Sequence, residues 1–112
     1  MIIKLNGTPE YVLFYETSNT LYYCNVDGFI IQKSKRTREE RKKITTINPE
    51  GEEVVTIGSK SFSVLDLMIN SFFSYYLNRS NDFEVIYRNG NKKDLRVENL
   101  MLYLPGFYQS GN

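Results

Sequence analysis

The sequence predicts a small α+β domain, with antiparallel β-hairpins in its N-terminal part and one main helix at about residues 64–77. Three observations support this class. A length of 112 residues fits one hydrophobic core and is too short for two. Short runs rich in β-branched and aromatic residues alternate with turn-forming stretches, which is typical of hairpins. One longer window has apolar residues at helical spacing, and it predicts a single main helix.

We expect the first half of the chain to form β-hairpins. The expected strands are residues 11–14, 21–23, 29–32, 44–47 and 54–57. The first two flank the turn-prone stretch ETSNT, and the last two flank NPEGEE, in which Pro and Gly favour a turn. GSKS, directly after the last strand, predicts a further turn. Residues 1–60 are therefore expected to be mainly hairpins.

The second half, residues 61–112, is predicted to begin with the helix. Ser63 is a natural N-cap, and Asp66 three residues later completes a capping pattern. The inward face of the helix would consist of Val64, Leu67, Met68 and Phe72, with Tyr75 or Tyr76. NRSND then signals a stop, which ends the helix near residue 77.

A hairpin-like unit is expected after the helix. Residues 83–87 read as a strand, and RNGNKKD reads as a turn. Residues 97–100 fit a single helical turn that leads into residues 101–104. Pro105 and Gly106 are expected to end this unit.

Charge is unevenly distributed along the chain. The net charge is +1, but seven of the fourteen Lys and Arg residues fall within residues 33–43. A second basic group lies in and around residues 88–96. If the two groups share a face, that face is strongly positive and suits a polyanion such as DNA or RNA. The candidate nucleic-acid-binding residues are Lys33, Lys35, Arg36, Arg38, Arg41, Lys42, Lys43, Arg88, Lys92, Lys93 and Arg96.

The basic stretch KSKRTREERKK fits two conformations. It can form a long hairpin tip, or an exposed helical turn in which Glu39 and Glu40 pair with neighbouring cations. Nearby aromatic residues, Tyr22, Tyr23 and Phe29, could stack on bases. A charged face that is simply solvated is the alternative interpretation.

Cysteine and histidine content limits the chemistry. Cys24 is the one cysteine and histidine is absent, so an internal disulfide and an ordinary zinc site are excluded. We expect a buried thiol in a reducing compartment, with no metal and no cofactor. The start MIIKLNG does not resemble a secretory signal, and no run approaches the roughly 18 to 20 apolar residues that span a bilayer. A cytoplasmic protein without a membrane partner is therefore expected.

One stretch near the C-terminus resembles a known family. Residues 87–100, YRNGNKKDLRVENL, fall without gaps on the motif HxDGNxxNNRVENL of phage and bacterial HNH endonucleases. FSVLDLMINSFF at residues 62–73 is similar to the helix that precedes this motif, and YCNVDGFI at residues 23–30 resembles the family's first strand. The resemblance spans about residues 22–104 and implies an HNH-like, ββα-type domain.

The catalytic activity that the resemblance implies depends on which residues stand at the catalytic positions of the motif. An HNH site holds a divalent cation and a histidine that deprotonates water. The histidine position is Tyr87, whose pKa near ~10 keeps it protonated at neutral pH, and the metal-ligand position before it is Ile86, which has no donor atom. A second ligand would lie near Tyr108, on a helix for which PGFYQSGN leaves no room. We therefore expect a degenerate, catalytically inactive domain.

The residues that match the motif also have structural interpretations. Asn89 and Gly90 form a strong turn signal, since both accept a positive φ. Asn99 is expected to hydrogen-bond loop backbone, and Leu100 to fill the core. Tyr87 is expected to pack in a strand with its hydroxyl at the surface. The matching residues are Gly90, Asn91, Arg96, Val97, Asn99 and Leu100.

Two classes of function stay open from the sequence. The first is an inactive HNH-like protein, phage-encoded by the resemblance, that binds DNA or RNA through the basic residues. The second is a protein-protein interaction module, either a virion structural component or a phage factor that binds a host protein. The aromatic tail LYLPGFYQ favours the second, because Tyr and Phe are enriched in interface cores. An active nuclease ranks third, and the sequence does not predict the oligomeric state.

Overall fold

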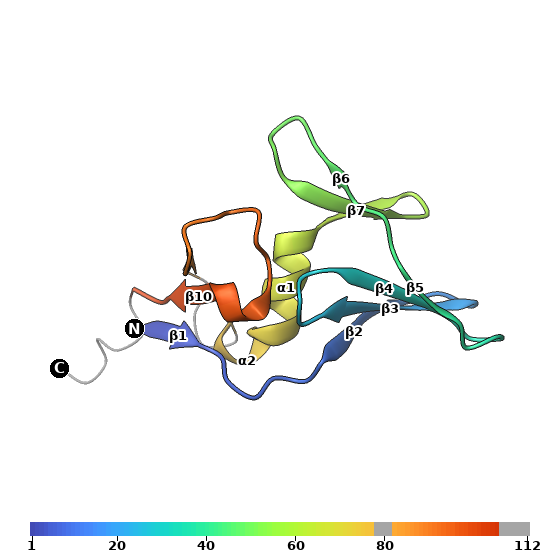
Figure 1. Cartoon of the computed structure of the whole chain (residues 1–112), viewed down its shortest axis with the longest axis horizontal. Helices are drawn as coiled ribbons and strands as arrows, with labels where there is room; N and C mark the ends of the chain where they lie inside the picture. Colours follow the sequence, from blue (N-terminus) through green and yellow to red (C-terminus); the bar gives the residue numbers. More distant parts are fainter. Residues whose placement is uncertain (78–81, 106–112) are drawn as a thin grey trace.

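The fold consists of three small antiparallel β-sheets arranged around helix α1 (Val64–Phe72) (Figure 1). It is described by a computed structural model that covers residues 1–77 and 82–105. The molecule is elongated, with principal extents of 54 × 29 × 24 Å. In the described ranges, no helix is long and apolar enough to cross a bilayer.

The largest sheet contains four strands in the order β2-β3-β4-β5. These strands are β2 (Tyr11–Glu16), β3 (Thr20–Asn25), β4 (Ile30–Ser34) and β5 (Glu40–Lys42). The Thr17 hydroxyl accepts the N–H of Thr20 at 3.1 Å, which closes the first predicted turn. The basic stretch forms the β4–β5 hairpin, so the hairpin alternative is confirmed and the helical one is wrong.

The second sheet has the order β6-β7-β8, with β6 (Thr46–Ile47), β7 (Glu53–Ile57) and β8 (Lys60–Ser63). Its first turn is built by Asn48, whose side-chain oxygen accepts the N–H groups of Glu50 and Glu52. This confirms the predicted hairpin around NPEGEE. The second turn is shorter than GSKS suggests, because its last two residues already belong to β8.

The third sheet joins the two ends of the described chain. Its strands are β1 (Ile2–Lys4), β10 (Leu100–Tyr103) and β9 (Glu84–Tyr87), with β10 in the middle. A 3-10 turn, η1 (Val97–Asn99), precedes β10 and confirms the predicted helical turn near residues 97–100. Strand β1 was not expected, because an isolated apolar pair gives no local strand signal.

Helix α1 begins where the sequence predicts. The Ser63 side chain accepts the N–H of Asp66, which confirms the N-cap. The helix ends earlier than expected, at Phe72, because Phe73 leaves the helical backbone conformation and its ring is fully buried. A short helix α2 (Ser74–Leu77) follows, so the prediction of one helix over residues 64–77 is wrong.

The predicted fold class is also wrong. An α+β, HNH-like (ββα-type) domain with one main helix was expected, whereas strands make up 42% and helices 16% of the described structure, in three sheets with two short helices. Several strands escaped the pattern because they are short and polar. ERK in β5 and KSFS in β8 lack apolar alternation, and pairing with neighbouring strands makes them extended.

One hydrophobic core cluster connects the three sheets and the helix. Its buried residues include Ile3, Cys24, Ile30, Val55, Ile57, Val64, Met68, Ile69, Phe73, Leu100, Leu102 and Leu104. Cys24 is free and buried, as predicted, and Ser71 donates a hydrogen bond to its sulfur at 3.4 Å. Burial raises the pKa of the Cys24 thiol to about 11, so the thiol stays protonated and unreactive at neutral pH.

Candidate nucleic-acid interface

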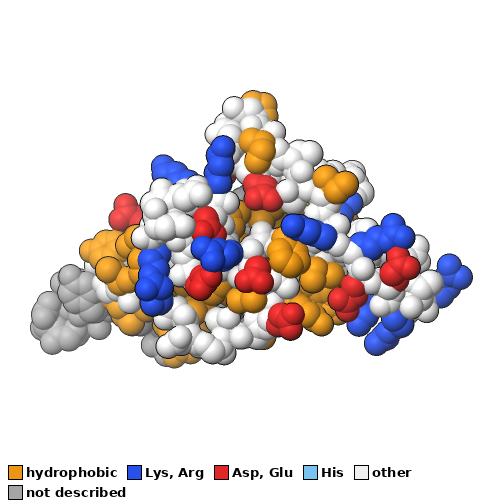
Figure 2. All heavy atoms as spheres, in the orientation of Figure 1, with side chains coloured by type: hydrophobic (Ala, Val, Ile, Leu, Met, Phe, Trp, Pro, Cys, Tyr) orange, Lys and Arg blue, Asp and Glu red, His pale blue; other side chains and the backbone are white. Residues whose placement is uncertain are grey.

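The basic hairpin, which we define as residues 33–43, projects from one end of the molecule (Figure 1). In the hairpin ladder, Ile31 pairs with Lys42, and Lys33 pairs with Glu40. Arg38 closes the tip with φ +66°, and its N–H donates to the Ser34 carbonyl at 2.9 Å. The seven predicted cations of this segment are therefore gathered on one element, which Figure 2 shows as Lys and Arg side chains around one end of the molecule.

Some of these cations are already engaged with carboxylates. Lys33 lies 3.6 Å from Glu40, and the Arg41 Nε lies 2.7 Å from Glu39. Lys35 pairs with Glu16 of β2. The Arg41–Glu39 pair is largely solvent-exposed and the other two are partly so, and ion pairs of this kind contribute little to stability and can be exchanged for a phosphate.

Other cations of the basic hairpin have no such partner. Over residues 1–77 and 82–105, no carboxylate lies within ion-pair distance of Arg36, Arg38 or Lys43. Lys42 places its ammonium 4.8 Å from the centre of the Phe29 ring, in a cation–π contact. The hairpin therefore presents uncompensated positive charge at its tip and at its base.

The second predicted group, Arg88, Lys92, Lys93 and Arg96, belongs to a different part of the surface. These residues lie in the polar loop, which we define as residues 88–96, between β9 and η1. Figure 1 shows this loop and the tip of the basic hairpin toward different ends of the long axis. The predicted residues thus form two groups rather than one continuous positive face.

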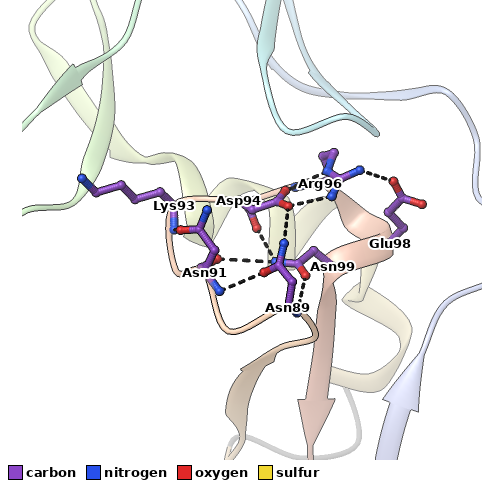
Figure 3. A network of polar contacts seen from close by, with 7 residues as sticks. All are labelled: Asn89, Asn91, Lys93, Asp94, Arg96, Glu98 and Asn99. Atoms are coloured by element: carbon purple, nitrogen blue, oxygen red, sulfur yellow. Dashed lines mark hydrogen bonds and ion pairs between the residues drawn. The ribbon is translucent and has the colours of Figure 1, made fainter.

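Arg96 is bound tightly within the polar loop (Figure 3). Its Nε and Nη2 donate to the two carboxylate oxygens of Asp94 at 2.8 and 2.7 Å, and Nη1 donates to Glu98. The hydrogen bonds from Arg96 hold the pKa of Asp94 well below its usual range, and Asp94 raises the pKa of Arg96. This arginine is consequently a structural clamp and is poorly placed to bind phosphate.

Lys92 and Lys93 face an acidic neighbour. Together with Tyr87 and Leu95 they line a cleft of about 260 Å³. The lining also includes Glu50 and Glu52 of the β6–β7 turn and Glu53 at the start of β7. In Figure 3 the Lys93 side chain extends away from the polar network. These acids offset the positive potential of the two lysines.

Buried Asn99 organises the polar loop, as the sequence predicts (Figure 3). Its side-chain oxygen accepts the N–H of Asn89 at 2.9 Å, and its amide donates to the Asp94 carbonyl at 2.9 Å. The predicted turn differs in one respect. Gly90 has φ +77°, but Asn89 does not adopt a positive φ. The side-chain oxygen of Asn89 instead accepts the N–H of Asn91 at 2.8 Å.

The polar loop is anchored against the turn between β3 and β4. Val97 donates its N–H to the Val26 carbonyl at 2.9 Å. Gly28 lies so close to the loop that a Cβ atom there would stand 2.8 Å from the carbonyl carbon of Leu95, and its φ is +90°. Only glycine fits this contact without displacement of the backbone.

Two positions that the resemblance aligns with catalytic residues lie in strand β9. Ile86 and Tyr87 end strand β9, where they pair with Met101 and Leu100. Burial, and then the nearby charge of Glu52, raise the pKa of Tyr87, so this phenol stays protonated at neutral pH. Within the described ranges, no group of three or more Cys, Asp or Glu residues could hold a metal ion. Tyr108 lies outside the described residues.

The aromatic residues proposed to stack on bases are divided between the two faces of the four-stranded sheet. Tyr22 packs against the core beside Phe14 and Tyr15, so it is poorly placed for stacking. Tyr23 lies on the opposite face, where its ring contacts Tyr11 at 5.1 Å. Tyr11 was not predicted as a candidate, although the alternation of YVLF indicates that Tyr11 and Leu13 share a face.

No family model matches the sequence, and no curated protein or solved structure is significantly similar to it. The similarity of residues 87–100 to an HNH motif therefore stays a prediction. A function for this chain has to rest on its own residues and their geometry.

Proposed function

We propose that the protein binds nucleic acid through the basic hairpin, by contacts to phosphates and without cleavage. The observation that carries this proposal is the concentration of seven cations and only two carboxylates in residues 33–43, on a hairpin that projects from the molecule. Lys and Arg on a projecting element reach phosphates without contacting base edges. Binding of this kind is strongly salt-dependent and weakly sequence-dependent.

The absence of cleavage is proposed from the identity of the residues at the motif positions. Tyr87 has a raised pKa and is not a proton acceptor at neutral pH, and Ile86 has no side-chain atom that could bind a metal. In the polar loop, Asp94 is committed to Arg96. These residues support a binding role for the protein.

The experiment is a fluorescence-anisotropy titration of labelled DNA over a range of salt concentrations. The test variant combines Arg36→Gln, Arg38→Asn and Lys43→Gln, with Asn at residue 38 because it tolerates a positive φ. Loss of three phosphate contacts should flatten the slope of log K against log salt by about 2 to 3 and weaken binding at low salt.

A matched control removes the same charge elsewhere. It combines Lys4→Gln, Lys92→Gln and Lys93→Gln, which lie on β1 and on the polar loop. This control should retain most of the affinity and the slope. Equal losses in both variants would contradict a role for the hairpin in particular, and no binding at low salt would refute the proposed function.

A second candidate, binding to a protein, is favoured by a different observation. Ile44, on the segment between β5 and β6, is 84% exposed, and Ile47, in the edge strand β6, is 62% exposed. Exposed β-branched residues next to a two-residue edge strand are suited to a protein contact. If nucleic acid fails to bind at low salt, this candidate becomes the better one, and Ile44→Ser with Ile47→Ser is the variant to compare in partner-binding assays.

A further inference from the structure

We infer that the solvent face of the four-stranded sheet, β2 to β5, binds unpaired bases, so that the preferred ligand is single-stranded nucleic acid. This inference rests on the proposed function, since the basic hairpin is the far edge of the same sheet. We call this surface the outer face. It includes Tyr11, Leu13, Tyr23, Phe29, Ile31, Lys33 and Lys42, and also Leu21 and Glu40, which pair with Lys33 in the ladder.

The register of the strands defines the outer face. Leu13 pairs with Tyr23, Tyr23 with Ile31, and Ile31 with Lys42, so one row of side chains crosses all four strands. Directly paired residues project to the same side of a sheet. The row begins with an apolar residue on β2 and ends with a cation on the basic hairpin.

Packing shows that this face is turned away from the core. The neighbouring residues in the strands, Cys24 and Ile30, are buried in the core cluster. Alternation along the strands then directs Tyr23 and Ile31 outward. At the edge of the row Tyr11 is 38% and Leu13 46% exposed. Figure 2 shows hydrophobic side chains gathered over this sheet, beside the Lys and Arg side chains of the hairpin end.

The aromatic rings are arranged so that they can stack with a ligand. Tyr11 and Tyr23 meet edge to face, with ring centres 5.1 Å apart and planes at 72°. An edge-to-face pair leaves ring faces available, and bases stack on such faces irrespective of sequence. Phe29 lies under the Lys42 ammonium, which places a cation next to a third ring. Aromatic rings interleaved with cations are what a single strand requires, because its bases and phosphates alternate.

The dimensions agree with a short single strand. Four strands separated by about 4.8 Å give a row of roughly 14 Å from Leu13 to Lys42, the length of about four stacked nucleotides. Lys33 lies on the same face, two residue pairs closer to the hairpin tip than Lys42. A strand whose bases contact Tyr11 and Tyr23 would therefore have its phosphates directed toward these lysines.

Duplex DNA fits the outer face less well. Bases in a duplex are stacked on one another and do not present a free ring face to a tyrosine. Duplex would contact the basic hairpin through phosphates alone, whereas a single strand would add contacts to the rings. Preference for single strands is thus the property that separates this inference from the proposed function.

The experiment compares labelled oligothymidine with duplex DNA of the same length, using Tyr11→Ala, Tyr23→Ala and the double variant. The control is Tyr75→Ala, an exposed tyrosine of helix α2 that lies outside the four-stranded sheet. Stacking is worth enough that each loss should weaken oligothymidine binding roughly 5- to 100-fold. Binding to duplex should change by less than about twofold, since it depends on the basic hairpin.

A second measurement does not depend on the stability of the variants. The chain has no tryptophan, so its intrinsic fluorescence comes from tyrosine. Oligothymidine should quench this fluorescence in the unaltered protein, and duplex should quench it less.

Tyr11→Phe, which keeps a ring at the edge of the row, should retain oligothymidine affinity and so separate stacking from loss of the hydroxyl.

The possible outcomes distinguish a failure of the proposed function from a failure of the single-strand inference. If neither DNA form binds at low salt, the proposed function is wrong and this inference falls with it. If both forms bind equally and the tyrosine variants behave like Tyr75→Ala, the outer face has no part in nucleic-acid binding, although the basic hairpin keeps its role. That result would instead make the outer face available to a protein partner.

Discussion

At the scale of single residues, the pair Asp94 and Arg96 determines the shape of the polar loop. Both carboxylate oxygens of Asp94 accept hydrogen bonds from the Arg96 guanidinium, and Asn89 donates a further one at 2.9 Å. All of these bonds favour the ionised carboxylate. Since the loop also anchors the β3–β4 turn, the charge of Asp94 is linked to the stability of the folded state.

This linkage gives a prediction for acid pH. The pKa of Asp94 is lower in the folded state than in the unfolded chain, so its ionised form stabilises the fold fully above about pH 4 and progressively less as pH falls toward the folded-state pKa. Arg96→Gln should move the Asp94 titration up toward its ordinary range. An NMR titration of the Asp94 side-chain carboxyl carbon measures both midpoints.

The comparison needs a control for general effects of charge. Arg88 lies in the same loop and makes no ion pair within the described ranges, so Arg88→Gln removes a cation without breaking such a pair. It should shift the Asp94 midpoint much less than Arg96→Gln does. Equal midpoints in the unaltered protein and in Arg96→Gln would show that the guanidinium is not the cause of the low pKa.

The contacts of a side chain could be predicted from the sequence only where the chemistry of that one residue determines them. The roles of Asn99 and Ser63 were predicted, because a side-chain amide in a turn and a hydroxyl before a helix have few other uses. Alternation along the strand separates Tyr22 from Tyr23, but which of the two faces the core, and the contact of Tyr11 with Tyr23, depend on the packing of the sheet. That information comes from the packing of other elements and is absent from the local sequence.

At the scale of elements, helix α1 depends on its N-terminal cap. Ser63 is both the last residue of strand β8 and the N-cap of α1, so the strand and the helix are joined without a loop. Ser63→Ala leaves the Asp66 N–H without its partner and should lower the free energy of unfolding by about 1 kcal/mol. Urea unfolding followed by far-UV circular dichroism measures this change.

The matched variant is Ser61→Ala, two residues earlier in β8. Ser61 is exposed and pairs with Thr56 through the backbone ladder, which a side-chain change leaves intact. It should alter stability by no more than about 0.5 kcal/mol. Similar effects of the two substitutions would mean that the helix does not depend on the cap.

The elements that the sequence predicted correctly are those whose ends are marked by turn chemistry. ETSNT, NPEGEE and the Ser63 cap each identify a boundary, and the structure places boundaries there. The fold class was missed because β1, β5 and β8 depend on partner strands for their conformation. The break at Phe73 was missed for a related reason, since burial of its ring outweighs helical periodicity.

At the scale of the whole molecule, the core is completed by residues from both ends of the described chain. Strand β1 pairs with β10, with Ile3 opposite Leu102, and both side chains belong to the core cluster. Local sequence cannot indicate this pairing, because the partners are almost the full chain apart. The cluster also contains residues of the other two sheets, so we expect the described part of the chain to unfold as one cooperative unit.

Adjacent isoleucines in β1 test this view. Ile3 is buried and Ile2 is exposed, although both belong to the same short strand. Ile3→Ala should lower the free energy of unfolding by roughly 2 to 5 kcal/mol through lost burial and the remaining cavity, whereas Ile2→Ala should change it by less than about 0.5 kcal/mol. Because small domains are marginally stable, the first loss should be visible as a large drop in the thermal midpoint.

The decisive measurement is the coincidence of two probes. Far-UV circular dichroism follows the sheets and the helix. Tyrosine fluorescence follows Tyr22 and Tyr23 in the four-stranded sheet, which β1 does not join, together with tyrosines elsewhere such as Tyr103 of β10. In Ile3→Ala both transitions should move together to the same lower midpoint. If the fluorescence transition stayed in place while circular dichroism showed an earlier loss, the sheet that carries the basic hairpin would be stable without β1, and the core would not be a single cooperative unit.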